Sequence, residues 1–386
     1  MARDKLVVVH GGAPTAVLNA SLYGVIDEAR KLAPQLQVLG ARHGTGGLLK
    51  EDLYDLSAVD PLLLPRLLTT PGSVIGSSRT PLQGEDYAQL AQVLRRMGAK
   101  YVLFNGGNGT MDACGKLRKA DPDLKVIGIP KTIDNDIAVT DHAPGFGSAA
   151  RYLALAVRDI AEDVRSLPIH ISVVEAMGRN AGWLAAAASL AGEEGIGADL
   201  IIPPELPFDE ERFLDQVQTL YRRQGCATIV VSEGLKDDQG MPIVPPLLTI
   251  GRAVYYGDIS AHLAKLIIER LNIKARSENP GIAGRAGSLQ QSESDRQEAE
   301  ACGREALRLA LAGKSGLMVT ISRADQETYR PVYGATDIES VMLHESSLPT
   351  AFLKEGGDGI SDSYKAWCRP LVGPLPDQFF DRRILD

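Results

Sequence analysis

Short runs of apolar residues alternate along the chain with longer amphipathic segments. Most of these runs are apolar at nearly every position, which is typical of strands covered on both faces in a parallel sheet. The predicted strands cover residues 6–9, 36–40, 101–104, 125–129, 170–175, 227–233 and 317–321. The segments between them predict helices, so the chain is expected to form right-handed βαβ units in a doubly wound α/β fold.

The helical segments are recognised by apolar residues that recur every three or four positions. Residues 87–97 and 146–164 each carry one such stripe, so we predict a helix over each range. Gly98 is placed to cap the end of the first helix. Ser292, in a polar stretch, is placed to cap the start of a third helix.

Composition narrows the class of protein. The 386 residues suffice for two or three domains, and the net charge of −8 argues against a nucleic-acid partner, which needs a basic face. The four cysteines are far apart, and the sequence has neither a CxxC motif nor a pair of histidines at the spacing of metal ligands. This pattern predicts reduced thiols in a cytosolic protein. The apolar run near the N-terminus is too short for a secretory signal or a membrane span. We therefore expect a cytoplasmic protein without a membrane partner.

Two glycine-rich segments follow predicted strands, where ligands bind in folds of this class. They are HGGAPTAVLN (10–19), with Gly11 and Gly12, and NGGNGTMDAC (105–114), with Gly107, Asn108, Gly109 and Thr110. Bare N–H groups at the start of a helix bind anions, so each segment can cradle a phosphate, and two cradles indicate a polyphosphate. For the first segment alone, an ordinary strand-to-helix turn is an equally good interpretation. Neither segment is a P-loop.

The segment IPKTIDND (129–136) places Lys131, Asp134 and Asp136 at the end of another predicted strand. One carboxylate near bound phosphates can hold Mg²⁺, and a second can accept the proton of an attacking hydroxyl. The lysine supplies positive charge to the transferring phosphoryl group. The alternative is a capping loop in which both aspartates accept backbone N–H groups. Beside two phosphate cradles, the chemical interpretation is preferred.

Later strand ends carry EAMGRNAGW (175–183), SEG (232–234) and KARSENPGIAGR (274–285). A guanidinium group binds phosphate in a bidentate manner, and a carboxylate accepts hydrogen bonds from hydroxyls. Arg179, Arg276, Arg285 and Glu233 therefore predict a site for a phosphorylated sugar.

Taken together, these motifs resemble the phosphofructokinase family, in the family's order from residue 10 to about 296. The resemblance implies two similar lobes, each a mainly parallel doubly wound sheet flanked by helices, with the active site in the cleft between them. It implies Mg²⁺-dependent transfer of a phosphoryl group from ATP or pyrophosphate to the 1-hydroxyl of fructose 6-phosphate. We expect residues 1–147 plus about 284–335 to form the donor lobe, and 148–283 plus about 336–386 the sugar-phosphate lobe.

The resemblance also assigns roles by position. It implies that Asp134 is the catalytic base, that Lys131 and Thr132 act beside it, and that Asn108 and Asp136 hold Mg²⁺. The implied donor-binding residues are Gly11, Gly12, Arg79, Gly107, Gly109 and Thr110. The implied substrate-binding residues are Thr132, Asp134, His170, Met177, Gly178, Arg179, Glu233, Arg276, Ile282 and Arg285. Since Arg276 matches a ligand supplied across a subunit interface, a homodimer or homotetramer is expected.

Two residues disagree about the donor. Within the family, Lys131 is typical of pyrophosphate enzymes, whereas Gly109 is found in ATP users. GGAPTAVLN and TDHAPGFGSAARY look most like the pyrophosphate branch, so we expect a reversible pyrophosphate-dependent enzyme of glycolysis. An ATP-dependent 6-phosphofructokinase is the alternative, and a non-catalytic regulatory subunit is a further one. A nicotinamide dehydrogenase is disfavoured, because ARHGTGG (41–47) offers no acidic ribose ligand.

The sugar phosphate is also left open. His170 falls where bacterial ATP enzymes place an interface arginine, and Ile282 replaces a polar or aromatic residue. A larger sugar phosphate, such as sedoheptulose 7-phosphate, is therefore a second candidate substrate. The last forty-five residues carry no motif and are expected to pack on the second lobe or at an interface.

Overall fold

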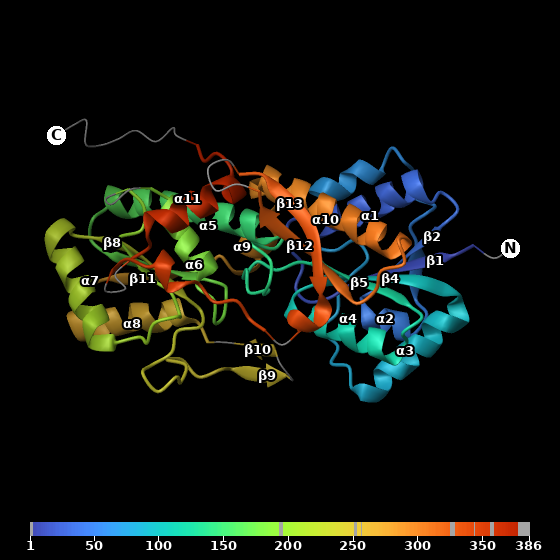
Figure 1. Ribbon diagram of the computed structural model, residues 1–386. Helices are drawn as coiled ribbons and strands as arrows, with labels where there is room; N and C mark the ends of the chain where they lie inside the picture. Colours follow the sequence, from blue (N-terminus) through green and yellow to red (C-terminus); the bar gives the residue numbers. More distant parts are fainter. Residues whose placement is uncertain are drawn as a thin grey trace.

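The protein has two mainly parallel sheets that lie side by side, and each sheet is flanked by helices (Figure 1). The structure is a computed structural model. It describes residues 3–192, 196–250, 253–255, 257–324, 329–342, 344–355 and 359–376.

The larger sheet has seven strands in the order β13-β12-β5-β4-β1-β2-β3. The strands are β1 (Lys5–His10), β2 (Gln37–Ala41), β3 (Leu53–Asp55), β4 (Ala99–Gly106), β5 (Lys125–Pro130), β12 (Leu317–Arg323) and β13 (Pro331–Asp337). The five inner strands pair in parallel, and only the two edge strands, β3 and β13, run antiparallel to their neighbours. The carboxyl ends of β1, β4 and β5 therefore meet at one edge of the sheet.

The smaller sheet has four strands in the order β11-β6-β8-β7, and all of its pairs are parallel. The strands are β6 (Ile171–Ala176), β7 (Leu200–Ile202), β8 (Ala227–Ser232) and β11 (Ala275–Glu278). A separate antiparallel pair is formed by β9 (Leu248–Ile250) and β10 (Ala253–Tyr255).

Helices cover the sheets. They are α1 (Leu18–Leu32), α2 (Thr45–Leu49), α3 (Gly84–Met97), α4 (Asn108–Ala120), α5 (Phe146–Ser166), α6 (Trp183–Ala187), α7 (Glu210–Gln224), α8 (Ile259–Leu271), α9 (Gly281–Ala286), α10 (Glu293–Leu311) and α11 (Asp362–Val372). Short 3-10 helices lie at Leu64–Thr69, Ala188–Leu190, Ser288–Gln290, Ile338–Ser340 and Thr350–Phe352.

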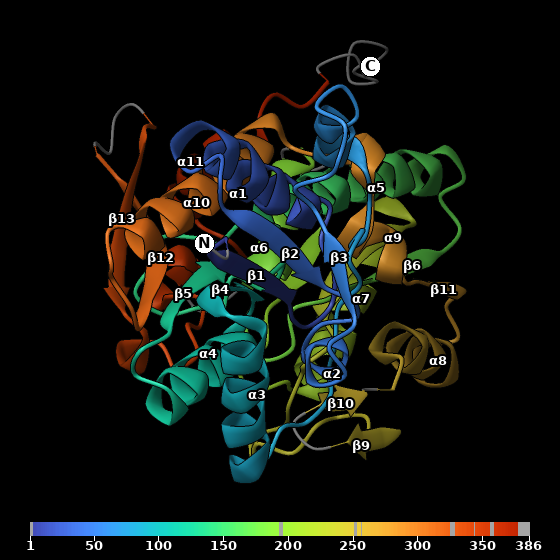
Figure 2. The same cartoon turned by 90° about the vertical axis from the view of Figure 1, so that its right-hand side faces the viewer.

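Strand β1 shows why the large sheet needs helices on both faces. Leu6 and Val8 pack in the core formed with α1 and α10, whereas Val7 and Val9 pack in the core formed with α3 and α4. Figure 2 shows these two helix layers on opposite sides of the sheet. Because side chains alternate along a strand, a run that is apolar at every position is what this double burial requires.

The predicted elements are confirmed: each of the seven predicted strands and three predicted helices is present within a few residues. Gly98 ends α3 in the left-handed conformation with φ 71°, and the Ser292 side chain accepts a hydrogen bond from the N–H of Asp295 at the start of α10. None of the helices in the described residues is both long and apolar enough to cross a bilayer.

Helix α11 packs where the C-terminal segment was expected. Its Tyr364 and Cys368 share a core with Val174 of β6 and Val230 of β8, so this part of the segment covers the second sheet. The final stretch, DRRILD, lies outside the described residues. Strands β12 and β13, in contrast, return to the large sheet. The exact lobe boundaries stay predictions.

Candidate active site

In the loop after β5, the side chain of Thr132, and not that of Asp134, makes the hydrogen bonds that hold the loop. The Thr132 hydroxyl accepts the N–H of Asp134 at 3.0 Å and donates to Oδ1 of Asp136 at 3.0 Å. In the part of the chain that the structure describes, the Asp134 carboxylate accepts no hydrogen bond. The threonine therefore shapes the loop, and the capping interpretation does not hold for Asp134.

The surroundings of Asp134 keep its carboxylate basic. Burial, together with the negative charges of Asp136 and Glu233, raises the pKa of Asp134 to about 7, against the opposing effects of Arg179 and Lys131. A carboxylate of this kind is suited to accept a proton near neutral pH. Since Glu233 and Arg179 come from loops of the smaller sheet, residues of both sheets meet at Asp134.

Lys131 lies buried beneath the first glycine turn. Its Nζ donates to the carbonyl of Ala13 at 2.5 Å, and a Cβ placed on Gly12 would lie 3.4 Å from that Nζ. Burial lowers the pKa of Lys131 to about 8, and the positive charges of Arg285 and Arg79 act in the same direction, opposed by Asp134. Three cations therefore gather here.

Arg285, on the short helix α9, completes this cationic group. Burial and the charge of Arg79 lower the pKa of its guanidinium, and its Nε is buried without a hydrogen-bond partner in the described residues. Three cations that repel one another around an unused donor favour the binding of an anion.

The expectation of bare N–H groups at the first glycine turn is wrong. The N–H of Gly11 donates to the carbonyl of Asn105 and that of Gly12 to the carbonyl of Ser78, each at 2.9 Å, because residues near Ser78 run alongside the end of β1. Moreover, α1 begins only at Leu18. What Gly12 provides is a backbone with φ 75° and room for Lys131.

The second glycine turn does open a helix. Gly107 is the N-cap of α4, so the N–H groups of Asn108 and Gly109 belong to the first turn, where no intrahelical acceptor exists. Gly109 is exposed, and no atom lies within 4 Å of a Cβ built on it. A Cβ on Gly11 would lie 2.3 Å from Oγ1 of Thr110, so the two turns touch.

Asn108 and Asp136 are adjacent, as a shared magnesium ion requires. Nδ2 of Asn108 donates to Oδ2 of Asp136 at 3.0 Å, and Oδ1 of Asn108 is buried without a partner in the described residues. Mg²⁺ is commonly held by one or two protein oxygens plus substrate phosphates, so this pair fits the ion. The described residues contain no group of three or more His, Cys, Asp or Glu side chains placed to hold a metal.

The motifs of the smaller sheet that were predicted to bind the sugar phosphate are hydrogen-bonded to each other. Oε1 of Glu233 accepts the N–H groups of Gly178 at 3.1 Å and Arg179 at 3.2 Å, and both of these residues have positive φ. A Cβ on Gly234 would lie 1.7 Å from the Arg179 carbonyl, which fixes glycine there. Met177 packs against the core beside this turn. Glu233 thus holds the turn with one oxygen, and the other is left for a ligand.

His170 and Arg276 lie away from this chain's own catalytic loop. His170 precedes the amino end of β6, roughly 20 Å of strand from Met177 at its carboxyl end. Arg276 is exposed on the edge strand β11 and lines a hollow of about 610 Å³ between β11 and α8. Ile282 is 70% exposed on α9. For His170 and Arg276, a role in substrate binding stays a prediction.

One neighbour of the loop escaped the motif analysis. Glu345 forms a bridge with Ile137, and the N–H of Ser346 donates to the carbonyl of Asp136 at 2.8 Å. After burial, which is the main cause, the Glu345 charge further raises the pKa of Asp136. Nothing in the local sequence indicates this contact, because it arises only when the C-terminal segment folds back.

Comparison with known proteins identifies the family of the chain. The family profile described as Phosphofructokinase matches residues 5–310. The chain is 36% identical over 388 residues to the pyrophosphate–fructose 6-phosphate 1-phosphotransferase of Xanthomonas campestris pv. campestris, covering 96% of this chain and 92% of that protein. It is 35% identical over 404 residues to the enzyme of the same name from Methylococcus capsulatus, covering 98% and 96%.

A solved structure supports the fold as well. The pyrophosphate-dependent phosphofructokinase of Marinobacter aquaeolei superposes with a TM-score of 0.87 at 33% identity, covering 98% of this chain and 94% of that one. The predicted two-lobed α/β fold is thereby confirmed. With a family match over most of its length and relatives above 30% identity along nearly all of it, the chain belongs to the phosphofructokinase family.

Proposed function

We propose that this enzyme transfers a phosphoryl group from pyrophosphate to the 1-hydroxyl of fructose 6-phosphate, giving fructose 1,6-bisphosphate and phosphate. The observation that carries the proposal is the Asp134 carboxylate, which accepts no hydrogen bond in the described residues and lies beside the cations Lys131, Arg79 and Arg285. A base and a phosphate site are the two groups that transfer to an alcohol requires. The names of the similar enzymes reported above support pyrophosphate as the donor and fructose 6-phosphate as the acceptor.

The chain's residues take distinct parts in the step. Asp134 accepts the proton of the 1-hydroxyl as its oxygen attacks the terminal phosphorus, and the bond to the bridging oxygen of pyrophosphate breaks. Lys131 and Arg79 balance the charge on the transferring group and the leaving phosphate. Arg285, which was expected to bind the sugar phosphate, lies near both and adds to this positive charge. Arg179 and the free oxygen of Glu233 orient the sugar phosphate.

Asn108 and Asp136 are the residues that would hold Mg²⁺, which when bound neutralises phosphate charge. The step is proposed to be reversible. It converts pyrophosphate and an alcohol into a phosphate ester and phosphate, and no nucleotide takes part. Its setting is proposed to be glycolysis in the cytoplasm.

Pyrophosphate is preferred over ATP as the donor because the Lys131 ammonium lies beneath the first glycine turn, and its charge there suits a compact, highly charged anion. Gly109 supports the alternative, since the space around it is open. Initial rates with fructose 6-phosphate and Mg²⁺ decide between them: we expect a fast rate with pyrophosphate and a negligible one with ATP. A fast rate with ATP alone would replace the proposal by the ATP-dependent enzyme, and no rate with either donor would favour another sugar phosphate or a regulatory subunit.

The Gly109→Asp variant tests whether the open space has any part in donor choice. We expect it to keep the pyrophosphate rate within a few-fold and to lose any residual ATP rate, since a carboxylate there opposes a longer polyphosphate. It should fold normally, because the position is exposed and an acidic residue in the first turn of α4 is favourable. Steady-state rates with both donors measure this. An unchanged ATP rate would show that Gly109 does not control the donor.

Arg276 is proposed to complete the sugar-phosphate site of a neighbouring subunit in a homodimer or homotetramer. The Arg276→Ala variant should raise KM for fructose 6-phosphate roughly 10- to 100-fold, the loss of a charged hydrogen bond. Mixed and re-associated with an Asp134→Asn variant, and assayed at fructose 6-phosphate well below the wild-type KM, it should regain about a quarter of wild-type activity in a dimer, because half the dimers are hybrids with one intact site. No recovery on mixing would place Arg276 outside the shared site.

A further inference from the structure

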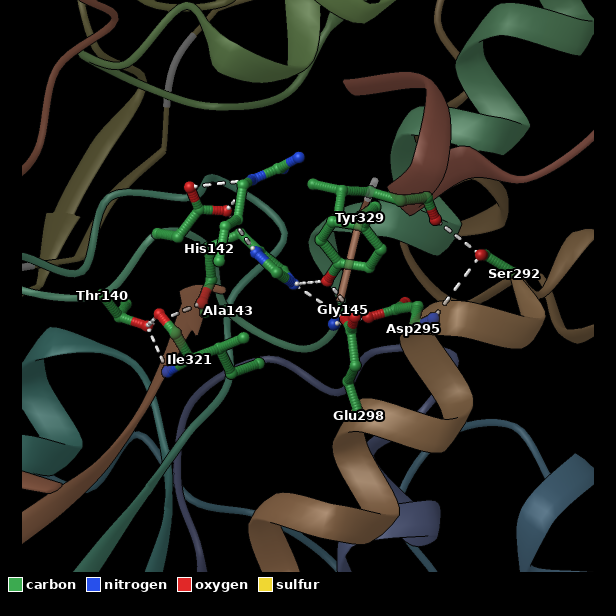
Figure 3. Close-up of polar contacts among 12 residues, drawn as sticks. Thr140, His142, Ala143, Gly145, Ser292, Asp295, Glu298, Ile321 and Tyr329 are labelled. Carbon is green, nitrogen blue, oxygen red and sulfur yellow. Dashed lines mark hydrogen bonds and ion pairs between the residues drawn. The ribbon is translucent and has the colours of Figure 1, made fainter. Parts of the chain in front are cut away.

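Helix α10 is hydrogen-bonded to the return segment, residues 140–145, which follows the catalytic loop. Asp295 accepts the N–H of Gly145 at 2.8 Å and that of Ser148 at 2.9 Å (Figure 3). The same segment supports the loop itself, since the N–H of Thr132 donates to the carbonyl of Pro144 at 3.1 Å. A displacement of residues 140–145 would therefore move the residues that position Asp134.

His142 lies between the return segment and α10, and its side chain is buried, with only 1% of the residue exposed. Its Nδ1 lies 2.7 Å from Oδ2 of Asp141, and its Nε2 lies 2.7 Å from Oε2 of Glu298 on α10. Figure 3 shows the ring between the loop and the helix. A neutral imidazole has one N–H, whereas both ring nitrogens here face carboxylate oxygens. Only the imidazolium form can donate to both.

The neighbouring elements supply the remaining charges. Arg323 of β12 pairs with Asp141 at 3.0 Å, and Trp367 of α11 donates to Asp141 at 3.1 Å. The Tyr329 hydroxyl donates to Glu298. Further titratable groups near Glu298 are Asp295 and Cys302 of α10 and Tyr333 of β13. With Arg323 and a protonated His142, the two carboxylates Asp141 and Glu298 are balanced, so loss of the proton leaves a buried negative charge.

Burial alone would lower the pKa of His142, but Glu298 and Asp141 outweigh it and raise this pKa to about 9. Because the folded-state pKa lies above the ordinary value of 6.5, the ion pairs stabilise the fold fully below pH 6.5. This stabilisation is lost progressively as the pH rises through about 9.

We propose that protonated His142 is a positioning residue, which holds the return segment against α10 and so fixes the catalytic loop for turnover. The kinetic part rests on the proposed function, whereas the ring's charge and contacts can be tested without any activity. His142 contacts neither the cationic group nor the Asn108–Asp136 pair. Its effect on catalysis passes through the segment's contacts with Thr132.

The activity-independent test is a titration of the histidine rings by NMR in ¹⁵N-labelled enzyme. The His142 resonance, assigned by its loss in a His142→Gln variant, is expected to show an imidazolium at pH 7 and to titrate well above pH 6.5. In Glu298→Gln its midpoint should fall by at least about one pH unit, because one of its two charge partners is gone. A ring that is neutral at pH 7 in the wild type would overturn the proposal.

The kinetic test compares Glu298→Gln with Glu28→Gln. Glu28 is a matched control: it is buried against the same helix, where it pairs with Arg308 at 2.7 Å and Arg304 at 3.2 Å, and it does not contact the return segment. We expect Glu298→Gln to move the alkaline fall of kcat to lower pH, with KM for fructose 6-phosphate nearly unchanged. Glu28→Gln should lower Tm but leave the kcat profile in place.

Lys131, with a pKa of about 8 in the free enzyme, is not expected to set this fall, because kcat reports the complex with bound pyrophosphate and that anion favours the charged lysine. A profile that stays in place in Glu298→Gln, or that moves equally in both variants, would contradict a positioning role for His142. If Glu298→Gln does not fold, Asp141→Asn removes the other charge partner and is expected to give the same shift.

Discussion

The Asp134→Asn variant is expected to lose roughly 10²- to 10⁴-fold in kcat, the usual contribution of a positioned general base. Asparagine has the same shape but cannot accept the proton of the attacking hydroxyl. Since the Asp134 carboxylate accepts no hydrogen bond in the described part of the chain, the loop, which is held by Thr132, should keep its form. Binding of fructose 6-phosphate, measured by calorimetry, should therefore change little while turnover collapses.

A control separates this effect from a general loss of charge. Asp159→Asn, at an exposed position on α5, removes the same charge without touching the loop and should leave kcat unchanged. Retention of full activity in Asp134→Asn would refute the assignment of this residue as the base. A parallel loss of sugar-phosphate affinity would instead indicate that the carboxylate holds the substrate.

The inner strands could be predicted from the sequence because burial on both faces leaves an uninterrupted apolar run. The edge strands could not. β13 alternates between partly buried and exposed residues, and β3 is short and largely exposed, so neither carries the signal of an inner strand. Their pairing depends on the neighbouring strand being present, which is a property of the assembled sheet.

In the candidate site, too, features that depend on contacts between distant parts of the chain could not be predicted from the sequence. Strand ends that follow apolar runs were located correctly, because parallel strands place their carboxyl ends at one edge. The use of the N–H groups of Gly11 and Gly12 was predicted wrongly, since the acceptor carbonyls lie on Asn105 and Ser78, far away in sequence. Glu345 and the pairing of His142 with Glu298 also depend on long-range contacts.

The buried Lys131 at the proposed donor site lowers the folding stability of the enzyme when no ligand is bound. Its ammonium is buried near Arg79 and Arg285, and its pKa is lowered to about 8, so the charged form is disfavoured until an anion binds. Because the folded-state pKa lies below the ordinary 10.5, the destabilisation is full below about pH 8 and fades as the pH rises toward 10.5. Function and stability thus make opposite demands on this residue.

The Lys131→Met variant is therefore expected to be inactive yet at least as stable as the wild type. Methionine keeps an apolar side chain of similar length, so the free variant should melt at the same or a higher temperature at pH 7. Its kcat with pyrophosphate should fall roughly 10²- to 10³-fold, as when one donor to a developing oxyanion is removed. Pyrophosphate with Mg²⁺ should raise the Tm of the wild type and scarcely that of the variant.

Lys116→Met is the matched control for this result, because Lys116 lies on the neighbouring α4, where it is partly exposed and pairs with Asp112 at 2.7 Å. It should retain activity and the shift of Tm with pyrophosphate. A Lys131→Met variant that is inactive and also strongly destabilised would mean that the lysine, through its bond to the carbonyl of Ala13, holds the glycine turn together. A variant that is stable, inactive and no longer stabilised by pyrophosphate would show that the buried charge serves the donor, since the fold does without it.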